Sequence, residues 1–429
     1  MSTRVQLLLF FGAGLTGMLF ATAQAEFPIT IGLDGGTFIN SECIQGELRI
    51  RTSPQVLPYL WVPLSNRGTV LRIATAAHET SDGRFVQRGD IVGEYRVAPS
   101  RCAYLGYSSY GPSRTSVDYD GNVWVAHRSP TSFDYGHHVV KIGTGFGEQW
   151  IDRNNNGRID TSQGYGDFLL GWCNDNQVCE SSDIQYAEDE LILAYVPVSA
   201  TGVRLVAVDQ NNDVWVGGSE NHEHGLLDGQ TGDIKRAFDR YACGYYTGGY
   251  GGVVDSAGVL WSAAGNDGTH LLRIDPTSNP LAHDCIAIAN SYGLAVDRLG
   301  KIWNTTFDDN QVRKLDPFDP YLGSNYSTGG DRARGVAVHP FGTLPAEDDI
   351  WIANSISNTV ARLARDGTLI KTINVGTEPT GVAVDSAGIV WVTNRGHEDE
   401  NEPWRIPGSV NANPKISEGG QDVERQRPG

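Results

Sequence analysis

Short apolar runs alternate with polar turns along most of this chain, and one arrangement recurs throughout. Its clearest marker is a tryptophan inside an apolar run, as in DVWVGG, VLWSAA, KIWNTT, DIWIAN and IVWVTN. Successive tryptophans in this series are 46, 42, 48 and 40 residues apart: Trp215, Trp261, Trp303, Trp351 and Trp391. Trp124 in NVWVAH and Trp61 in YLWVPL extend the series to seven. The intervals of 63 and 91 residues that separate Trp61, Trp124 and Trp215 predict insertions.

Each repeat contains more than its tryptophan. An aspartate precedes the tryptophan by six residues at Asp118, Asp209, Asp255, Asp297 and Asp385. Between the two lies a turn such as SAG, RLG or QNN, in which Gly and Asn tolerate positive φ. An apolar run such as GVAV precedes the aspartate, and a third run such as THLLRIDP follows the tryptophan. The pattern predicts two buried strands around a tight turn, followed by one or two further strands.

Four strands in 40–45 residues are typical of a propeller blade. We therefore predict an all-β chain that forms a single β-propeller of about seven four-stranded blades over residues 26–410, with an insertion at about 145–198. A β-sandwich or a pair of barrels is the alternative, although neither calls for a repeat of this length. The last blade lacks an outer strand, which the segment GELRIRT near the N-terminus could supply. Residues 411–429 are polar and are expected to be disordered.

The first 25 residues are typical of an export signal. Arg4 is followed by the apolar stretch LLLFFGAGLTGMLFA, and Ala23-Gln24-Ala25 fits a small-x-small cleavage site. A membrane anchor is the alternative, but no later segment reaches the ~20 apolar residues that cross a bilayer. We expect a secreted or periplasmic protein with no membrane span after cleavage.

The charge and the cysteine content of the chain limit its classes of partner and predict covalent links. The formal net charge is −18, which excludes nucleic acid as a partner because its binding needs a basic surface. Six cysteines in an exported chain favour disulfides. Cys173 and Cys179 are the simplest pair, and the other four, Cys43, Cys102, Cys243 and Cys285, allow three pairings that the sequence does not distinguish.

The repeats resemble those of NHL-type and streptogramin (virginiamycin B) lyase-like propellers. The segments that carry the resemblance are GVAVDSAGIVWVTN (381–394), GLAVDRLGKIWN (293–304) and TSVDYDGNVWVAH (115–127). The lyase family shows Pro-His-Gly before the inner strand and Trp-Phe-Thr-Glu on the next. The corresponding positions here are Pro379-Thr380-Gly381 and Trp391-Val392-Thr393-Asn394, without the histidine or the glutamate. The resemblance therefore implies the fold but not the elimination reaction.

The insertion contains a calcium-type loop. Asp152-Arg-Asn154-Asn-Asn156-Gly-Arg158-Ile-Asp160 matches the first nine positions of an EF-hand loop. Position twelve is Gln163 instead of a bidentate Glu, so Asp167 or an acid from Glu188-Asp189-Glu190 would complete the ligands. We predict a structural Ca²⁺ held by Asp152, Asn154, Asn156, the Arg158 carbonyl and Asp160, with a metal-free polar turn as the alternative.

The inner strands of a propeller begin at its axis, so one position per blade predicts a shared site. The position eleven residues before each tryptophan gives Ser113, Arg204, Tyr250, Tyr292 and Thr380, and Arg334 aligns with them in the sixth blade. Arg114 lies one residue further along. Arginine pairs with carboxylate or sulfate, and tyrosine stacks on sugar or aromatic rings. We predict a ligand site of Arg114, Arg204, Tyr250, Tyr292 and Arg334; the alternative is a solvated opening whose arginines pair with neighbouring acids.

Histidines near acids are weaker candidates for catalysis. Glu220, His222 and His224 follow the Trp215 strand and could act as a base pair or as metal ligands. Exposed polar side chains are the simpler interpretation. The sequence thus favours an exported binding protein for a small-molecule, glycan or protein ligand. The alternative is a lyase or lactone-hydrolase-type enzyme that uses an axial histidine and a divalent metal, and a purely structural surface protein is a third.

Overall fold

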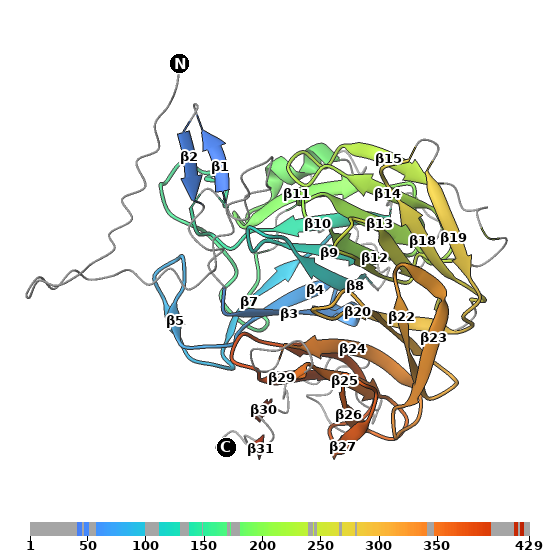
Figure 1. Ribbon diagram of the computed structural model, residues 1–429. Coiled ribbons are helices and arrows are strands. Elements are labelled where there is room, and N and C mark those ends of the chain that lie inside the picture. Colours follow the sequence, from blue (N-terminus) through green and yellow to red (C-terminus); the bar gives the residue numbers. More distant parts are fainter. Residues whose placement is uncertain are drawn as a thin grey trace, which may run out of the picture. The chain divides into compact units, whose positions relative to one another are not determined.

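The computed structural model describes residues 41–44, 47–50, 57–98, 111–128, 137–147, 149–169, 172, 181–238, 243, 247–265, 268–278, 281–340, 347–395, 416–418 and 421–423. The chain divides into two compact units, residues 1–54 and 55–429. In the first unit, β1 (Ser41–Ile44) and β2 (Glu47–Ile50) form an antiparallel hairpin. All other described elements belong to the second unit (Figure 1).

The second unit is built from seven antiparallel sheets, numbered here in chain order. Sheet 1 has the three strands β3 (Tyr59–Leu64), β4 (Thr69–Ala74) and β7 (Ile91–Arg96), and a hairpin of β5 (His78–Glu79) and β6 (Phe85–Val86) follows β4. Sheet 2 contains β8 (Pro112–Val117), β9 (Val123–His127), β10 (His138–Ile142) and β11 (Ile192–Pro197). Sheet 3 contains β12 (Val203–Val208), β13 (Val214–Gly218), β14 (His224–Leu227) and β15 (Ile234–Phe238). Sheet 4 contains β16 (Gly251–Val254), β17 (Leu260–Ala263), β18 (Leu271–Asp275) and β19 (Ala282–Ile286).

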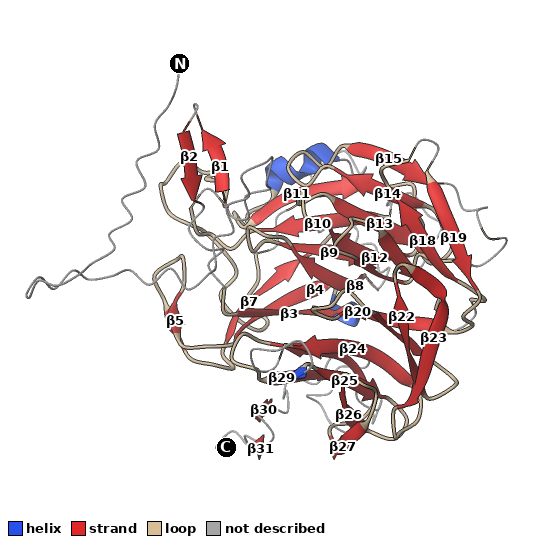
Figure 2. Cartoon of the chain, in the orientation of Figure 1, coloured by secondary structure: helices blue, strands red, loops and turns tan. Residues whose placement is uncertain are grey.

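The last three sheets continue the same order. Sheet 5 contains β20 (Ser291–Val296), β21 (Ile302–Thr306), β22 (Gln311–Asp316) and β23 (Asp319–Ser327). Sheet 6 contains β24 (Ala333–His339), β25 (Asp349–Asn354), β26 (Thr359–Ala364) and β27 (Leu369–Asn374). Sheet 7 contains β28 (Pro379–Val384), β29 (Val390–Asn394), β30 (Ile416–Glu418) and β31 (Gln421–Val423). Two short 3₁₀ helices, η1 (Ser65–Arg67) and η2 (Ser181–Tyr186), are the helical segments of the described chain (Figure 2).

The sheets form a closed propeller. The first strand of each sheet packs beside the first strand of the next, from β3 through β8, β12, β16, β20 and β24 to β28. Val62 and Leu71 of sheet 1 share a buried cluster with Trp391 of sheet 7 and with Ile389, which directly precedes β29. This cluster closes the ring. The predicted all-β propeller is therefore confirmed: six blades have four strands and the remaining sheet has three.

The tryptophan repeat marks the second strand of sheets 2 to 7. There the indole lies opposite a smaller residue of the first strand, as in the pairs Ala207 with Trp215 and Ala383 with Trp391. All six of these tryptophans are buried. In four sheets a lysine or arginine of the third strand lies over the indole ring: Lys141, Arg273, Lys314 and Arg362. The repeat thus encodes one packing layer in the middle of each sheet.

The repeated aspartate stabilises the turn that precedes this strand. Asp385 Oδ1 accepts hydrogen bonds from the backbone N–H groups of Ala387 and Ile389, both at 2.9 Å. Its Oδ2 accepts the indole N–H of Trp391, also at 2.9 Å. Asp255 and Asp297 bind the indole N–H groups of Trp261 and Trp303 in the same way, whereas those of Trp124 and Trp215 have no hydrogen-bond partner among the described residues. In three sheets one carboxylate therefore binds both the turn and the tryptophan six residues later.

Sheet 1 departs from the repeat. Trp61 lies on the first strand, β3, and not on the second, so its assignment to the tryptophan series was wrong in register. Arg72 of β4 holds the central position, opposite both Trp61 and Gly93. This buried guanidinium lies over the rings of Tyr59, Trp61 and Tyr95. In sheet 1 the tryptophan thus lies on the first strand, and the arginine takes the place on the second strand that a tryptophan holds in the other sheets.

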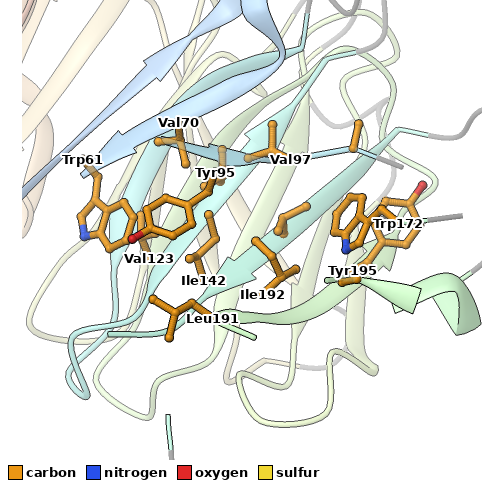
Figure 3. Close-up of a cluster of buried hydrophobic side chains, with 14 residues drawn as sticks. Trp61, Val70, Tyr95, Val97, Val123, Ile142, Trp172, Leu191, Ile192 and Tyr195 are labelled. Atoms are coloured by element: carbon orange, nitrogen blue, oxygen red, sulfur yellow. The ribbon is translucent and has the colours of Figure 1, made fainter. Parts of the chain in front are cut away.

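The insertion connects the third and fourth strands of sheet 2. It packs on the propeller through Trp172, Ala187 and Leu191, which share a buried cluster with Trp61 and Tyr95 of sheet 1 (Figure 3). Side chains of both adjoining sheets thus cover the insertion on one side. This apolar core therefore holds the insertion against the propeller.

The outer strands of sheet 7 come from a different part of the chain than expected. The described part of the GELRIRT segment, residues 47–50, forms β2, whose partner is β1 and which is not a strand of sheet 7. Instead β30 pairs with β29, and β31 pairs with β30. Both lie beyond residue 411, where we expected disorder. Each of these strands has only three residues, too few for a sequence pattern to predict.

One disulfide is present among the described residues. Cys243 is bonded to Cys285 with a Cα–Cα distance of 5.6 Å, joining the segment before sheet 4 to the outer strand β19. This is one of the pairings left open by the sequence. The proposed Cys173–Cys179 pair lies outside the described residues.

Candidate functional site

The five side chains predicted to form a ligand site come together in the structure. Arg204 Nη1 donates a hydrogen bond to the Tyr250 hydroxyl at 3.2 Å, and that hydroxyl donates to the Tyr292 hydroxyl at 2.9 Å. The Arg334 guanidinium lies 5.9 Å from the centre of the Tyr292 ring. These residues start the first strands of sheets 3 to 6, so successive sheets bring residues up to 130 positions apart (204 to 334) into one cluster.

Arg114 reaches residues of sheets that do not adjoin its own. It begins in sheet 2, yet its guanidinium lies 5.1 Å from the ring centre of Tyr250 and 5.4 Å from that of Tyr292. Those two rings belong to sheets 4 and 5. A Cβ built on Gly251 would approach Arg114 Nη1 to 2.9 Å, so the glycine leaves room for this side chain. Arg114 therefore extends across the axis of the ring.

A second set of residues completes the cluster, and the sequence analysis missed it. Phe307 stacks on Tyr292 with ring centres 5.0 Å apart, and the guanidiniums of Arg332 and Arg334 lie over its ring at 4.9 and 5.2 Å. Arg128 lies close enough to the cluster for its pKa, which burial lowers, to be lowered further by the charge of Arg204 and raised by Tyr250 and Tyr292, and Arg395 also lowers it. Phe307 and Arg128 both follow a repeat tryptophan by four residues, at the end of the second strand. That column is as regular as the first and could have been found in the same way.

Seven side chains form what we call the axial cluster: Arg114, Arg128, Arg204, Tyr250, Tyr292, Phe307 and Arg334. Within the described part of the chain, no carboxylate forms an ion pair with any of its four arginines. The Nε atoms of Arg128 and Arg334 are buried without a hydrogen-bond partner. Burial, and next the charge of Arg204, lower the pKa of Arg128. The aromatic rings support the guanidiniums but do not neutralise them.

The two tyrosines respond differently to this environment. Burial raises the pKa of Tyr250, but Arg204, Arg114 and the hydrogen bond with Tyr292 outweigh it, so the net pKa is lowered. Burial and the neighbouring Tyr250 raise the pKa of Tyr292 to about 12. Tyr250 is thus the phenol of the pair that loses its proton first.

The histidine candidates do not converge on the axial cluster. His224 is buried and its Nε2 lies 2.9 Å from Ser262 Oγ. Burial lowers the pKa of His224 to about 4. The Nδ1 atom of His222 lies 3.0 Å from the Gly248 carbonyl oxygen, and Glu220 is exposed at the surface. His222 and His224 therefore take part in local hydrogen bonds. The described residues contain no group of three His, Cys, Asp or Glu side chains able to hold a metal.

The calcium-type loop folds around its own polar side chains. Asp160 Oδ2 accepts hydrogen bonds from the side-chain amides of Asn154 and Asn156, at 2.5 and 2.7 Å. Asp152 accepts the backbone N–H groups of Asn156 and Gly157, at 3.0 and 2.9 Å. Gly157 has a φ of 72°, a left-handed conformation that suits glycine. Four predicted ligand side chains therefore face one another across a tight turn.

Buried Glu190 anchors this loop. Its two carboxylate oxygens accept the backbone N–H groups of Arg153, at 2.8 Å, and Asp160, at 2.9 Å. Asp189 instead accepts hydrogen bonds from Thr161, Ser162 and Leu191. Among the acids considered for the remaining position, Glu190 is thus the one that touches both sides of the loop.

No protein-family model and no curated protein matches this chain. Solved structures do match. A streptogramin B lyase is 15% identical, with a TM-score of 0.49, over 80% of this chain and 91% of that chain. Virginiamycin B lyase from Staphylococcus aureus is 12% identical, with a TM-score of 0.48, over 79% of this chain and 92% of that chain. A catalytically inactive variant of the latter enzyme with quinupristin is 13% identical, with a TM-score of 0.47, over 79% and 92%.

The propeller class that the sequence resembles is thus among the matched structures. The described residues include no helix that is long and apolar enough to cross a membrane.

Proposed function

We propose that this chain is a binding protein whose axial cluster captures an anionic ligand. The observation that carries the proposal is the convergence of four guanidiniums, from Arg114, Arg128, Arg204 and Arg334, which have no carboxylate partner among the described residues. Arginine presents a planar fork that fits carboxylate or sulfate oxygens, and such charge-assisted hydrogen bonds are among the strongest in proteins. Arg204 donates to the neutral Tyr250 hydroxyl, and an incoming anion would supply the negatively charged acceptor that the described residues do not offer these groups.

The charge of the rest of the molecule supports this interpretation. With a formal net charge of −18, the protein has ample carboxylates to neutralise four arginines, as it does for Arg362 and Arg365. Keeping all four unpaired at one place costs electrostatic free energy, because like charges repel in a poorly solvated setting. A ligand that offsets this repulsion gains affinity from it. Acidic sugars and other carboxylated or sulfated molecules have the required chemistry.

A glycan array tests the proposal. The wild-type protein is expected to bind uronate- or sulfate-bearing glycans over neutral ones, and binding should fall as salt rises because ion pairs are screened. Arg204→Ala should reduce the signal at least tenfold, since a buried charge-assisted contact is worth about 1.5–3 kcal/mol.

Arg236→Ala is the matched control. Arg236 lies exposed on the outer strand β15, so the variant loses the same charge away from the cluster. It should bind as the wild type does. If Arg204→Ala and Arg236→Ala retain equal signals on every anionic glycan, the axial cluster is not the binding site.

The loop of residues 152–160 is proposed to hold a structural Ca²⁺. Asp152, Asn154, Asn156 and Asp160 would supply side-chain oxygens, after rotation of the two amides, and Arg158 its carbonyl oxygen. Bound calcium would cross-link the insertion that covers sheets 1 and 2.

Melting curves check this assignment. Calcium should raise the melting temperature relative to excess chelator, because a ligand of the folded state stabilises it. Asp152→Ser should abolish the response. Identical melting temperatures of the wild type in calcium and in chelator would exclude the metal.

We also propose that the chain is exported. The signal-like first 25 residues support this, and so does the Cys243–Cys285 disulfide, because disulfides persist in oxidising compartments. Fractionation of cells that express the full chain, with N-terminal sequencing of the mature protein, tests it. A protein that keeps residues 1–25 and stays in the cytoplasm would exclude export.

The alternative of a lyase or lactone hydrolase finds less support. An enzyme of that kind needs a histidine within hydrogen-bond reach of the ligand. His222 and His224 are instead engaged with Gly248 and Ser262. Binding is therefore the function that the axial cluster favours.

A further inference from the structure

The Tyr250 hydroxyl holds the central position among the cationic groups of the axial cluster. It accepts a hydrogen bond from Arg204 Nη1 at 3.2 Å and donates one to the Tyr292 hydroxyl at 2.9 Å. The Arg204 guanidinium also lies over its ring, 4.6 Å from the centre, and that of Arg114 lies at 5.1 Å. A negative charge on this oxygen would be held by two arginines from different sheets.

Among the described residues, the charged and titratable groups that act most strongly on Tyr250 are cations and one phenol. They come from four other sites on the ring, Arg114 on β8, Arg204 on β12, Tyr292 on β20 and Arg334 on β24, and Arg128 after β9 also interacts with Tyr250. Burial opposes ionisation of Tyr250, but Arg204, Arg114 and the hydrogen bond with Tyr292 favour it more strongly, so the pKa of Tyr250 lies below that of a free phenol. The pKa of Tyr292 moves the other way, to about 12. The first proton therefore leaves from Tyr250.

We infer that the deprotonated Tyr250 hydroxyl acts as a built-in anion of the site, which an anionic ligand displaces from Arg204 and Arg114 by binding while Tyr250 takes up a proton. This inference rests on the proposed function, since it concerns the same arginines. It adds a rule for the affinity: phenolate and ligand exclude one another, because both need the same positive charges. No covalent step is involved, and the proton comes from solvent.

The sign of the pH dependence follows from that exclusion. Below the pKa of Tyr250 the phenol is neutral, the arginines are available and the ligand binds with its full affinity. Above that pKa the phenolate must be protonated before the ligand binds, so affinity falls about tenfold per pH unit. Replacing Tyr250 with Phe removes the competing anion, so this variant should bind the ligand more tightly than the wild type at alkaline pH. Removal of a contacting hydrogen-bonding group would ordinarily weaken binding.

The test uses inorganic sulfate as the probe and the full-length protein. Sulfate affinity is measured by calorimetry across neutral and alkaline pH for the wild type and for Tyr250→Phe, in two buffers that differ in ionisation enthalpy. The wild type should take up close to one proton per sulfate at pH values above the pKa of Tyr250, whereas Tyr250→Phe should take up none there. The affinity ratio of the two proteins should change about tenfold per pH unit in that range.

Two further variants separate this mechanism from a general effect of alkaline pH. Once Tyr250 is deprotonated, the Tyr292 hydroxyl becomes the donor of the bond between them and stabilises the phenolate. Tyr292→Phe removes that donor, so the break in the affinity profile should move to higher pH. Tyr119→Phe removes an exposed tyrosine, 59% accessible, and should leave the profile unchanged. An ultraviolet titration, taken as wild type minus Tyr250→Phe, reports the phenolate of Tyr250 directly and should shift upward in sulfate.

The outcomes distinguish the two proposals. If sulfate binds to the wild type and to Tyr250→Phe with the same pH profile and no proton uptake, the inference is wrong while the anion site stands. If sulfate binds to neither protein at any pH, the anion site itself is refuted and the inference falls with it.

Discussion

Replacing Asp297 with Ala is expected to cost far more stability than the same change at Asp385. Both aspartates belong to the repeat, and each accepts two backbone N–H groups of its turn and the indole N–H of its tryptophan. Asp297 differs because its Oδ2 also accepts a hydrogen bond from Arg365 Nε at 3.0 Å. Arg365 follows β26 of sheet 6, so this carboxylate joins two blades.

The expected loss follows from the burial of the pair. The Asp297 side chain is fully buried and that of Arg365 is 14% exposed. Removing one partner of a buried ion pair costs about 3–5 kcal/mol, because the remaining charge has no counterpart. Losing the hydrogen bonds of Asp385 alone costs about 1–3 kcal/mol. We therefore expect a difference of about 2 kcal/mol between the two variants.

Equilibrium unfolding in urea measures both variants by linear extrapolation. A double-mutant cycle with Arg365→Ala isolates the link between the blades, and the expected coupling is about 1–3 kcal/mol. If Asp297→Ala and Asp385→Ala are equally destabilised and the coupling is zero within error, the ion pair contributes nothing to the free energy of unfolding and this prediction is wrong.

Two other predictions concern stability. Cys243→Ala should lower the free energy of unfolding by about 2–4 kcal/mol, since the disulfide closes a segment with a sequence separation of 42 residues; an unchanged urea midpoint under oxidising conditions would contradict it. The pKa of His224 is lowered to about 4, because burial disfavours the charged form. The stability that neutral His224 contributes is therefore complete above the unfolded pKa, near 6.5, and is lost as pH falls toward 4. Between pH 7 and pH 5 the wild type should lose about 2 kcal/mol more than His224→Gln, and parallel losses in urea titrations would contradict this assignment.

The fold was predictable because the repeats contain the same packing unit, an aspartate-stabilised turn followed by a buried tryptophan. In all five repeats with this aspartate, its carboxylate accepts backbone N–H groups of the turn. In three of them it also accepts the indole N–H, as Asp385 does from Trp391. The register of sheet 1 was not predictable by the same route. There Arg72 replaces the tryptophan of the second strand, and Trp61 lies on the first strand, so a search for tryptophan alone places that strand wrongly.

The candidate site was predictable to the extent that ring geometry determines it. Because every first strand begins near the axis, one alignment column gathered Arg204, Tyr250, Tyr292 and Arg334. Arg128 and Phe307 come from the ends of the second strands, and finding them required knowing that these ends meet the same axis. Neither column predicts that Arg114 crosses to distant sheets, since this depends on its rotamer and on the space beside Gly251.

The ring closes between sheets 1 and 7 by side-chain packing. It does not close through a single sheet that combines described strands from both ends of the propeller. Among the described strands, sheet 1 draws only on the beginning of the propeller and sheet 7 only on its end, and the two meet through side chains such as Leu71 and Trp391. No backbone ladder between the described strands crosses that boundary, so separating these strands requires the loss of apolar contact but of no strand pairing. The seam is therefore where we expect the ring to open first under denaturant, and amide exchange should report it as the earliest loss of protection.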